Sequence, residues 1–338
     1  MKRILLVATG GTIASQNTGD GLAPNITPNG LIDYIPEVKD ICEIETLQVL
    51  NIDSTNMQPE FWPIIVESIK KNYYNYDGFV ISHGTDTMAY TASAISYMIQ
   101  NSDKPIILTG SQKPIDLPDT DAKSNLYHAF LTASSDEVSG VHIVFDSKVI
   151  VGTRGRKYRS KSFAAFDSIN LPFAYEIIDN KLIKNNDLDL DIDILKTKEE
   201  VTFYEDIFPN IFLLKLTPGM DPDVLDYIGE KYAGVVIESY GVGGIPFNDK
   251  RNFLEKLGSL TEKGKTVVIA TQVTYEGSDM GIYEVGLKAL NNYKILQAYD
   301  MTVESAIAKL MWILPREKEY DKIKELFYTK INNDINVG

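Results

Sequence analysis

Two short segments combine glycines with hydroxyl and carboxyl side chains, a pattern that suits a site for a polar ligand. They are Thr9-Gly10-Gly11-Thr12-Ile13-Ala14 and His83-Gly84-Thr85-Asp86-Thr87-Met88. Glycine lets the backbone turn sharply and approach a ligand closely. Thr-Gly-Gly-Thr alone is equally compatible with a simple turn. The second segment is more specific, because capping a helix explains one of its hydroxyl or carboxyl groups but not the whole Thr-Asp-Thr run.

Threonine hydroxyls of this kind are able to support hydrolysis. A threonine acts as a nucleophile when a lysine or tyrosine takes its proton. Thr85, Asp86 and a distant lysine would form such a relay, and these residue types alone do not choose the lysine. The basic run 154–161 is typical of a solvated loop, but it is also able to bring one ammonium group to the carboxylate.

Other catalytic patterns are absent from the sequence. It contains no Gly-x-x-x-x-Gly-Lys-Ser/Thr phosphate loop, no dinucleotide fingerprint and no Gly-x-Ser-x-Gly nucleophile elbow. Its three histidines lack metal-ligand spacing. Its single cysteine, Cys42, excludes an intrachain disulfide and a multi-thiolate metal site. We therefore expect no metal centre.

The elements that must position these segments follow from the apolar pattern. Short β-branched-rich runs bounded by turn residues predict buried strands at Ile4–Ala8, Gly78–Ser82, Pro105–Thr109 and Val141–Phe145. Apolar residues at helical spacing predict helices over Pro59–Tyr76, Asp86–Gln100 and Asp121–Ser135. This alternation indicates an α/β fold with a doubly wound parallel sheet and helices on both of its faces.

Ligands bind beyond the carboxyl ends of the strands in such sheets. Three polar loops follow predicted strands: the two segments above and Gly110-Ser111-Gln112-Lys113-Pro114. They form one site if their strands are neighbours.

A second, smaller α/β domain is predicted toward the C-terminus. The stretch 179–205 is acidic and polar and lacks apolar periodicity. We place a domain carrying the motifs at 1–184, a connector at 185–207 and a C-terminal domain at 208–338. In the last, strands are expected at Ile211–Leu216, Gly234–Glu238 and Thr266–Ala270, and helices at Pro222–Lys231, Asp249–Leu260, Thr302–Leu314 and Lys318–Lys330.

Composition limits the partners of this 338-residue chain. The 33 Lys and Arg residues and 47 Asp and Glu residues give a net charge of −14. This balance disfavours nucleic acid or an anionic membrane as a partner. The N-terminal apolar run Ile4–Ala8 is shorter than the roughly 7–15 residues of a signal peptide's core, so we interpret it as the first buried strand. We expect a cytoplasmic protein.

The two glycine-containing segments resemble the signature motifs of bacterial-type L-asparaginases, and the chain is similar to the cytosolic type I members. The resemblance extends over nearly the whole length, because further blocks keep the family order. These blocks are Asp53-Ser54-Thr55-Asn56-Met57, Tyr76-Asp77-Gly78-Phe79-Val80, Thr109-Gly110-Ser111-Gln112, Ser239-Tyr240-Gly241-Val242-Gly243 and Asp300-Met301-Thr302-Val303-Glu304.

The resemblance implies cofactor-free hydrolysis of L-asparagine to L-aspartate and ammonia, with glutamine as a weaker substrate. By match to the motifs, Thr12 is the nucleophile. The second catalytic group combines Thr85, Asp86 and Lys157, where the spacing from Gly152 to Phe166 matches the family. The implied substrate-binding residues are Asp53, Ser54, Thr55, Thr85, Asp86 and Ser111, with Asp86 on the α-ammonium and Ser54 on the α-carboxylate.

Family features also lie outside these motifs. The segment Ser15–Asn29 corresponds to a lid that closes over substrate, but Leu22 stands where many members have a tyrosine, so the group that activates Thr12 stays open. Family sites lie at subunit contacts, which implies a homodimer or homotetramer in which a neighbour contributes Tyr275 and Glu276. Glu238 replaces an arginine used in a regulatory site of some relatives, so no such regulation is implied.

Two alternatives remain. The missing lid tyrosine is compatible with a non-catalytic amino-acid sensor. The core motifs are shared with the archaeal amidotransferase subunit that releases ammonia from glutamine, although we do not find that subunit's additional N-terminal domain, which favours the asparaginase function.

Overall fold

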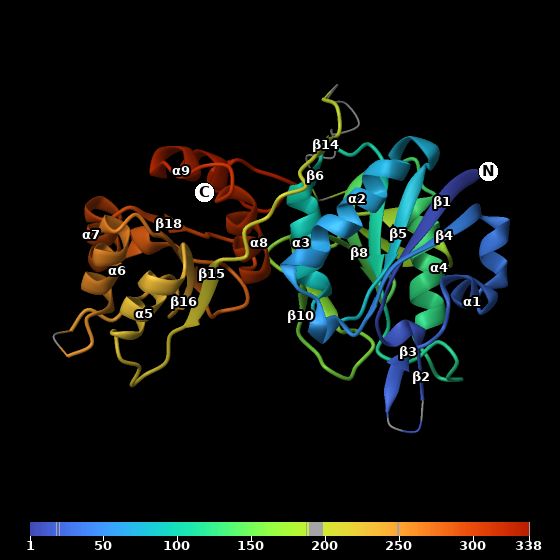
Figure 1. The fold of residues 1–338 in the computed structure, drawn as a ribbon, viewed down its shortest axis with the longest axis horizontal. Coiled ribbons are helices and arrows are strands. Elements are labelled where there is room, and N and C mark those ends of the chain that lie inside the picture. Colours follow the sequence, from blue (N-terminus) through green and yellow to red (C-terminus); the bar gives the residue numbers. More distant parts are fainter. Residues whose placement is uncertain (18, 20, 187, 189–198, 249, 338) are drawn as a thin grey trace. The chain divides into compact units, whose positions relative to one another are not determined.

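A computed structural model describes residues 1–17, 19, 21–186, 188, 199–248 and 250–337. The chain divides into two units, Met1–Glu205 and Asp206–Gly338. Both are built from strands and helices in alternation (Figure 1). The predicted α/β class, with a larger N-terminal and a smaller C-terminal sheet, is confirmed. Part of the predicted connector, residues 187 and 189–198, lies outside the described residues.

The N-terminal unit is organised around one eight-stranded sheet in the order β13-β12-β9-β8-β7-β5-β1-β4. Five adjacent strands are parallel: β4 (Cys42–Ile52), β1 (Lys2–Gly10), β5 (Gly78–Ser82), β7 (Pro105–Thr109) and β8 (Gly140–Phe145). Three antiparallel strands extend it: β9 (Lys148–Val151), β12 (Tyr175–Ile178) and β13 (Lys181–Lys184). The prediction found four of the parallel strands, but missed β4 and the antiparallel extension.

Helices cover both faces of this sheet, as the alternation predicts. On one face, Ile4 and Leu6 pack in a single apolar cluster with side chains of α1 (Pro28–Asp33) and α4 (Ala122–Ala133). The alternate residues Leu5 and Val7 are equally buried outside that cluster, on the opposite face. There α3 (Met88–Met98) contacts β7 and β8, and α2 (Trp62–Asn72) contacts β4 (Figure 1).

Small elements complete this unit. The predicted lid region contains an antiparallel pair, β2 (Ser15–Asn17) and β3 (Leu22–Pro24). A second pair joins β10 (Gly155–Lys157) to β11 (Phe166–Ser168), and a third joins β6 (Ile99–Gln100) to β14 (Thr202–Phe203). The described part of this unit also contains the 3₁₀ turns η1 (Thr12–Ala14), η2 (Pro36–Asp40), η3 (Ser54–Asn56), η4 (Pro59–Phe61) and η5 (Tyr73–Asn75).

The C-terminal unit has a four-stranded parallel sheet in the order β15 (Ile211–Lys215), β16 (Gly234–Ser239), β17 (Thr266–Thr271) and β18 (Ile295–Gln297). Its helices are α5 (Val224–Lys231), α6 (Phe253–Glu262), α7 (Glu284–Asn292), α8 (Val303–Ile313) and α9 (Tyr320–Tyr328), with the 3₁₀ turn η7 (Met280–Ile282). The helix predicted from residue 249 begins instead at Phe253, because the Asn252 side chain accepts from the Glu255 N–H and caps it there. Neither α7 nor β18 was predicted.

A fully buried ion pair fixes the end of the chain to α8. The Lys309 ammonium lies 2.5 Å from Asp334 Oδ2 and donates to the Thr329 carbonyl at 2.7 Å. Both charged side chains are completely shielded from solvent. Burial lowers the pKa of Lys309, and the Asp334 carboxylate opposes that shift.

No helix in the described part of the chain is long and apolar enough to cross a membrane.

Candidate active site

Four loops meet at the carboxyl edge of the parallel sheet, where the sequence placed a site. They follow β1, β4, β5 and β7, which are neighbours in the sheet. The condition set by the sequence, that the strands of the three polar loops lie side by side, is therefore met. The fourth loop, after the unpredicted strand β4, contributes Ser54.

Glycines bring these loops into backbone contact. Gly11 has a φ of +83°, and a Cβ at this position would lie 2.4 Å from the amide nitrogen of Gly84. A Cβ on Gly84 would in turn lie 2.5 Å from Ser54 Oγ. Only glycine fits at either position, because real Cβ contacts are never that short. The glycines of the two motifs are therefore needed for the close contact between their backbones. A simple turn in each motif would not explain that contact.

A buried chain of hydrogen bonds shapes the loop after β5. Trp62 Nε1 donates to Thr91 Oγ1 at 3.1 Å, and Thr91 Oγ1 lies 3.0 Å from His83 Nε2. His83 Nδ1 lies 2.7 Å from the carbonyl oxygen of Gly84, which only accepts, so Nδ1 carries the proton. Burial lowers the pKa of His83 to about 4, so the ring is neutral near pH 7. His83 is completely buried, and both of its ring nitrogens contact protein groups that support the loop.

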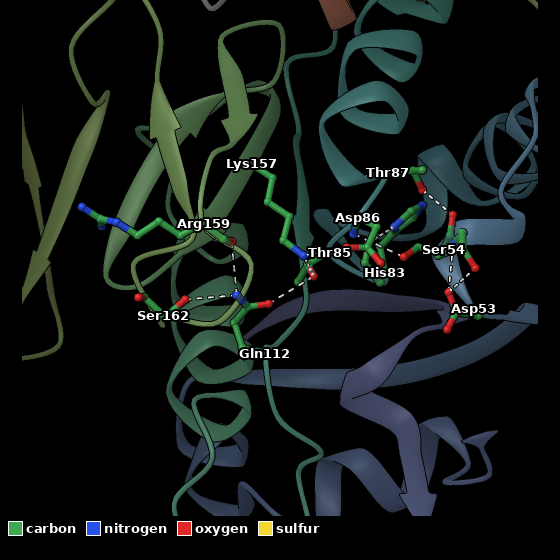
Figure 2. A network of polar contacts seen from close by, with 12 residues as sticks. Asp53, Ser54, His83, Thr85, Asp86, Thr87, Gln112, Lys157, Arg159 and Ser162 are labelled. Atoms are coloured by element: carbon green, nitrogen blue, oxygen red, sulfur yellow. Dashed lines mark hydrogen bonds and ion pairs between the residues drawn. The ribbon is translucent and has the colours of Figure 1, made fainter. Parts of the chain in front are cut away.

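Three of the predicted catalytic residues lie in direct contact (Figure 2). Lys157 Nζ donates to Thr85 Oγ1 and to Asp86 Oδ1, in each case at 2.7 Å. The Thr85 side chain is buried, whereas that of Asp86 is about half exposed. A lysine ammonium thus bridges a shielded hydroxyl and a carboxylate that opens to solvent.

The structure shows no side-chain helix cap in this segment, although the sequence was compatible with one for a single residue. Helix α3 begins at Met88 after the cap residue Thr87, whose side chain makes no capping hydrogen bond. Thr87 Oγ1 instead donates to the carbonyl of Ser54 at 2.8 Å. The Thr85 and Asp86 side chains bond to Lys157 and Gln112 and do not cap the helix. The Thr-Asp-Thr run therefore belongs to the cluster of polar residues at this edge of the sheet.

Lys157 reaches the site from the end of β10, one strand of the β10–β11 hairpin. The basic run 154–161 is not simply a solvated loop, because Arg154 is completely buried and Lys157 is mostly shielded. Its later residues, from Arg159 to Lys161, are exposed. The run therefore combines an interior anchor, a site lysine and a surface loop.

The loop after β4 presents a hydroxyl beside Asp86. Ser54 is buried, and its Oγ accepts from the Asp86 backbone N–H at 3.3 Å. Asp53 caps η3 by accepting from both the N–H and the hydroxyl of Thr55, each at 2.8 Å. Ser54 thus lies within the cluster, while Asp53 and Thr55 are exposed and bond to each other.

Among the described residues, Thr12 and Ser111 make no hydrogen bond to this cluster. Thr12 begins η1 directly after Gly11 and forms no hydrogen bond with Thr85, Asp86 or Lys157, all of which the structure describes. Ser111 is buried and donates to the Lys113 carbonyl at 2.5 Å within its own loop. Leu22 lies in β3, and its side chain is outside the described part.

Tyr275 and Glu276 belong to the C-terminal unit, in the loop after β17. Their predicted role is in a neighbouring subunit's site, so it stays a prediction.

Gln112 is a site residue that the sequence reasoning missed. Thr85 Oγ1 donates to its Oε1 at 3.3 Å, and its Nε2 donates to the carbonyl of Ser162 at 3.1 Å (Figure 2). Its backbone N–H bonds both oxygens of the buried Asp121 carboxylate, at 3.1 and 2.9 Å. Burial raises the pKa of Asp121. The sequence signals for Gln112 were its position in a strand-end loop and its place in the Thr109-Gly110-Ser111-Gln112 block.

This arrangement suits a zwitterionic ligand. A carboxylate and a serine hydroxyl lie together, so they are able to bind an ammonium and a carboxylate. A lysine beside a threonine hydroxyl is able to exchange a proton with a reacting group. No group of metal-ligating side chains is found among the described residues.

Sequence comparison identifies the class of protein that carries this fold and site. Residues 3–189 match the family described as "Asparaginase, N-terminal", and residues 210–327 match "Glutaminase/Asparaginase C-terminal domain". The chain therefore belongs to the asparaginase family, and it is an amidohydrolase.

Two relatives with different names are similar to nearly the whole chain. The chain is similar to an L-asparaginase of Thermococcus kodakarensis, with 38% identity covering 98% of this chain and 99% of the relative. A subunit of the glutamyl-tRNA(Gln) amidotransferase of Sulfurisphaera tokodaii is 34% identical, covering 98% of this chain and 75% of that protein.

Solved structures show the same similarity. The thermostable L-asparaginase from Thermococcus kodakarensis has a TM-score of 0.92 and 36% identity, covering 99% of this chain and 100% of that one. L-asparaginase I from Vibrio cholerae has a TM-score of 0.87 and 30% identity, covering 99% of both chains.

Proposed function

We propose that this chain hydrolyses L-asparagine to L-aspartate and ammonia without a cofactor. The observation that carries the proposal is the position of Lys157 Nζ, 2.7 Å from both Thr85 Oγ1 and Asp86 Oδ1. Similarity to L-asparaginases along nearly the whole chain supports the choice of substrate.

In the proposed reaction, Thr12 Oγ attacks the side-chain amide carbon of asparagine. The C–N bond breaks, a proton passes to the leaving nitrogen, and ammonia departs from an ester on Thr12. Water then adds to this ester, aspartate is released, and a proton returns to Thr12 Oγ. Thr85 and Lys157 form the group that moves protons in these steps. The backbone N–H of Thr12 or Thr85 stabilises the oxyanion.

The contacts of the cluster support separate positions for the two charged ends of the substrate. Asp86 Oδ1 bonds Lys157, which leaves Oδ2 for the α-ammonium. Ser54 Oγ accepts from the Asp86 N–H and so keeps its own proton to donate to the α-carboxylate. Asp53, Thr55 and Ser111 lie in the adjoining loops and would complete the binding surface.

The test is ammonia release from L-asparagine and, separately, from L-glutamine, with purified protein and no added metal. We expect rapid release from asparagine and slower release from glutamine. Thr12→Ala should abolish release, whereas the exposed Thr202→Ala on β14 should not change it. An absence of ammonia from both substrates, with asparagine binding retained in calorimetry, would instead favour an amino-acid sensor.

A second candidate is supply of ammonia from glutamine to a partner enzyme. It is favoured by the similarity to subunits of glutamyl-tRNA(Gln) amidotransferases, which are 32–34% identical and match 98–99% of this chain. The same assay separates the two functions. A kcat/KM higher for glutamine than for asparagine would favour ammonia supply.

We also propose a homodimer or homotetramer in the cytoplasm, with Tyr275 and Glu276 of one subunit contributing to the site of another. Light scattering after size-exclusion chromatography tests the assembly. If Tyr275→Ala and Glu276→Ala both preserve activity and oligomeric state, the neighbour's contribution is refuted.

A further inference from the structure

Among the described residues, Gln112 is the side chain that joins the Thr85 hydroxyl to the loop that follows Lys157. Its Oε1 accepts from Thr85 Oγ1 at 3.3 Å. Its Nε2 donates to the carbonyls of Ser162 at 3.1 Å and Arg159 at 3.4 Å. Because carbonyl oxygens only accept, these two contacts fix which end of the amide faces the loop.

We infer that Gln112 is a positioning residue that holds Lys157 against Thr85, an inference that rests on the proposed function for its kinetic consequence. The two lysine contacts require the end of β10 to keep its place. Within the loop, the N–H groups of Tyr158 and Arg159 bond the Ala165 carbonyl, so the segment closes on itself. Gln112 attaches that closed loop to the strand-end loop after β7, beside the hydroxyl that Lys157 contacts.

The backbone of Gln112 is itself fixed, so its side chain works from a stable base. Asp121 accepts the backbone N–H groups of both Gln112 and Lys113, and its Oδ2 also accepts from Asn125 Nδ2 at 3.2 Å. These bonds anchor the loop to the start of α4. They do not involve the Gln112 amide, and the side chain is only half-buried, so we expect substitutions there to leave the fold intact.

The threonine contact gives Gln112 a further effect on the site. Lys157 donates a hydrogen bond to Thr85 Oγ1, and the Thr85 hydroxyl donates its own hydrogen bond to Gln112 Oε1. The acceptor thereby orients the Thr85 hydroxyl with a lone pair toward the ammonium. Only an amide both accepts from Thr85 and donates to two carbonyls, so methionine and glutamate each break the connection.

The test compares the wild type with Gln112→Met, Gln112→Glu and Gln100→Met. Gln100 is the matched control, because its amide also donates to a backbone carbonyl, that of Tyr97 at 2.9 Å, but at the opposite end of α3. Hydrogen exchange of residues 158–166 reads out loop position whether or not the protein turns over asparagine. We expect exchange about tenfold faster in both Gln112 variants and unchanged in Gln100→Met.

Steady-state kinetics supply the second readout. With asparagine, kcat should fall about tenfold or more in both Gln112 variants, with KM and the thermal midpoint close to wild type. Unchanged exchange, or unchanged kcat in an active wild type, would overturn the inference. So would a loss of folded protein in both variants, which would show a purely structural role. Faster exchange with no turnover in the wild type would refute the proposed function and leave the positioning role standing.

Discussion

The backbones of Gly11 and Gly84 lie in direct contact, although 73 positions separate them in the sequence. A Cβ on Gly11 would come within 2.4 Å of the Gly84 nitrogen and 2.6 Å of its Cα. Each glycine belongs to a different motif and follows a different strand. The contact holds Thr12 and Thr85, one residue beyond each glycine, in adjoining loops.

Replacement of Gly11 by alanine should therefore damage both fold and activity. The new Cβ clashes with rigid backbone, and a φ of +83° is unfavourable for alanine. We expect a loss of about 3 kcal/mol or more in the free energy of unfolding. Urea denaturation and ammonia release measure the two effects.

Gly264→Ala is the matched control for the clash. Gly264 has a φ of +76°, but a Cβ there meets nothing within 4 Å. The backbone strain of alanine at this positive φ should by itself lower the free energy of unfolding by about 1–2 kcal/mol. Equal losses in the two variants would show that the Gly11–Gly84 contact has no special role.

Lys157→Met should remove catalysis while leaving the protein folded. The variant leaves Thr85 and Asp86 without their shared ammonium. We expect kcat for asparagine to fall about 10²–10⁴-fold, the usual range for loss of a proton-transfer group. Lys161→Met, an exposed lysine of the same loop, should retain wild-type kcat. Retention of kcat by Lys157→Met would remove Lys157 from the mechanism.

Stability should fall as the pH drops from about 6.5 toward 4, because two histidines are buried in their neutral form. Burial lowers the pKa of both His83 and His142 to about 4. In the unfolded chain these rings take up protons near their ordinary pKa of 6.5, so the unfolded state binds more protons in this range. Each histidine should lower the free energy of unfolding by about 2 kcal/mol at about pH 5.

The contribution of one histidine is measured by comparing His142→Leu with the wild type. Urea denaturation across this pH range should give a shallower pH dependence in the variant, since carboxylates titrate alike in both proteins. Parallel curves would show that His142 takes up a proton equally well in the folded state.

The buried Lys309–Asp334 pair should be costly to break from one side. Asp334→Ala removes the counterion of a buried ammonium, and we expect a loss of about 3–5 kcal/mol in the free energy of unfolding. The double variant Lys309→Met with Asp334→Ala should lose less than the sum of the single variants. Glu284→Ala breaks an exposed pair with Lys288 in the same unit and should leave stability nearly unchanged. Additive losses at Lys309 and Asp334 would contradict this coupling.

Strands and helices with a strong apolar pattern were predictable from the sequence. The position of the two motifs at the ends of strands was predictable as well. Strand β4 was missed because the prediction used continuous apolar runs, whereas the apolar residues of this edge strand alternate with Glu43 and Glu45, as in a half-buried strand. The antiparallel strands β9 and β12 have only four residues each, too few for a periodic signal.

The site was predictable where a motif named its residues. The side-chain role of Gln112 was not, because its partners Thr85, Arg159 and Ser162 lie 27, 47 and 50 positions away. Only the folded sheet brings those groups together. The partners of Thr85 and Asp86 were equally a tertiary effect: the sequence showed that a helix cap does not explain the whole run, but it did not show that Lys157 and Gln112 bond these side chains.

The β10–β11 hairpin follows the other residues of the cluster in the sequence, so it is synthesised after them. Lys157 follows Thr85 by 72 positions, and β11, which pairs with its strand, ends at Ser168. A nascent chain that has exposed residues 1–150 carries the hydroxyls and the carboxylate without their cation. Under the proposed mechanism, amide hydrolysis on the ribosome has to wait until the hairpin emerges, and we expect an interrupted translation product of that length to be inactive.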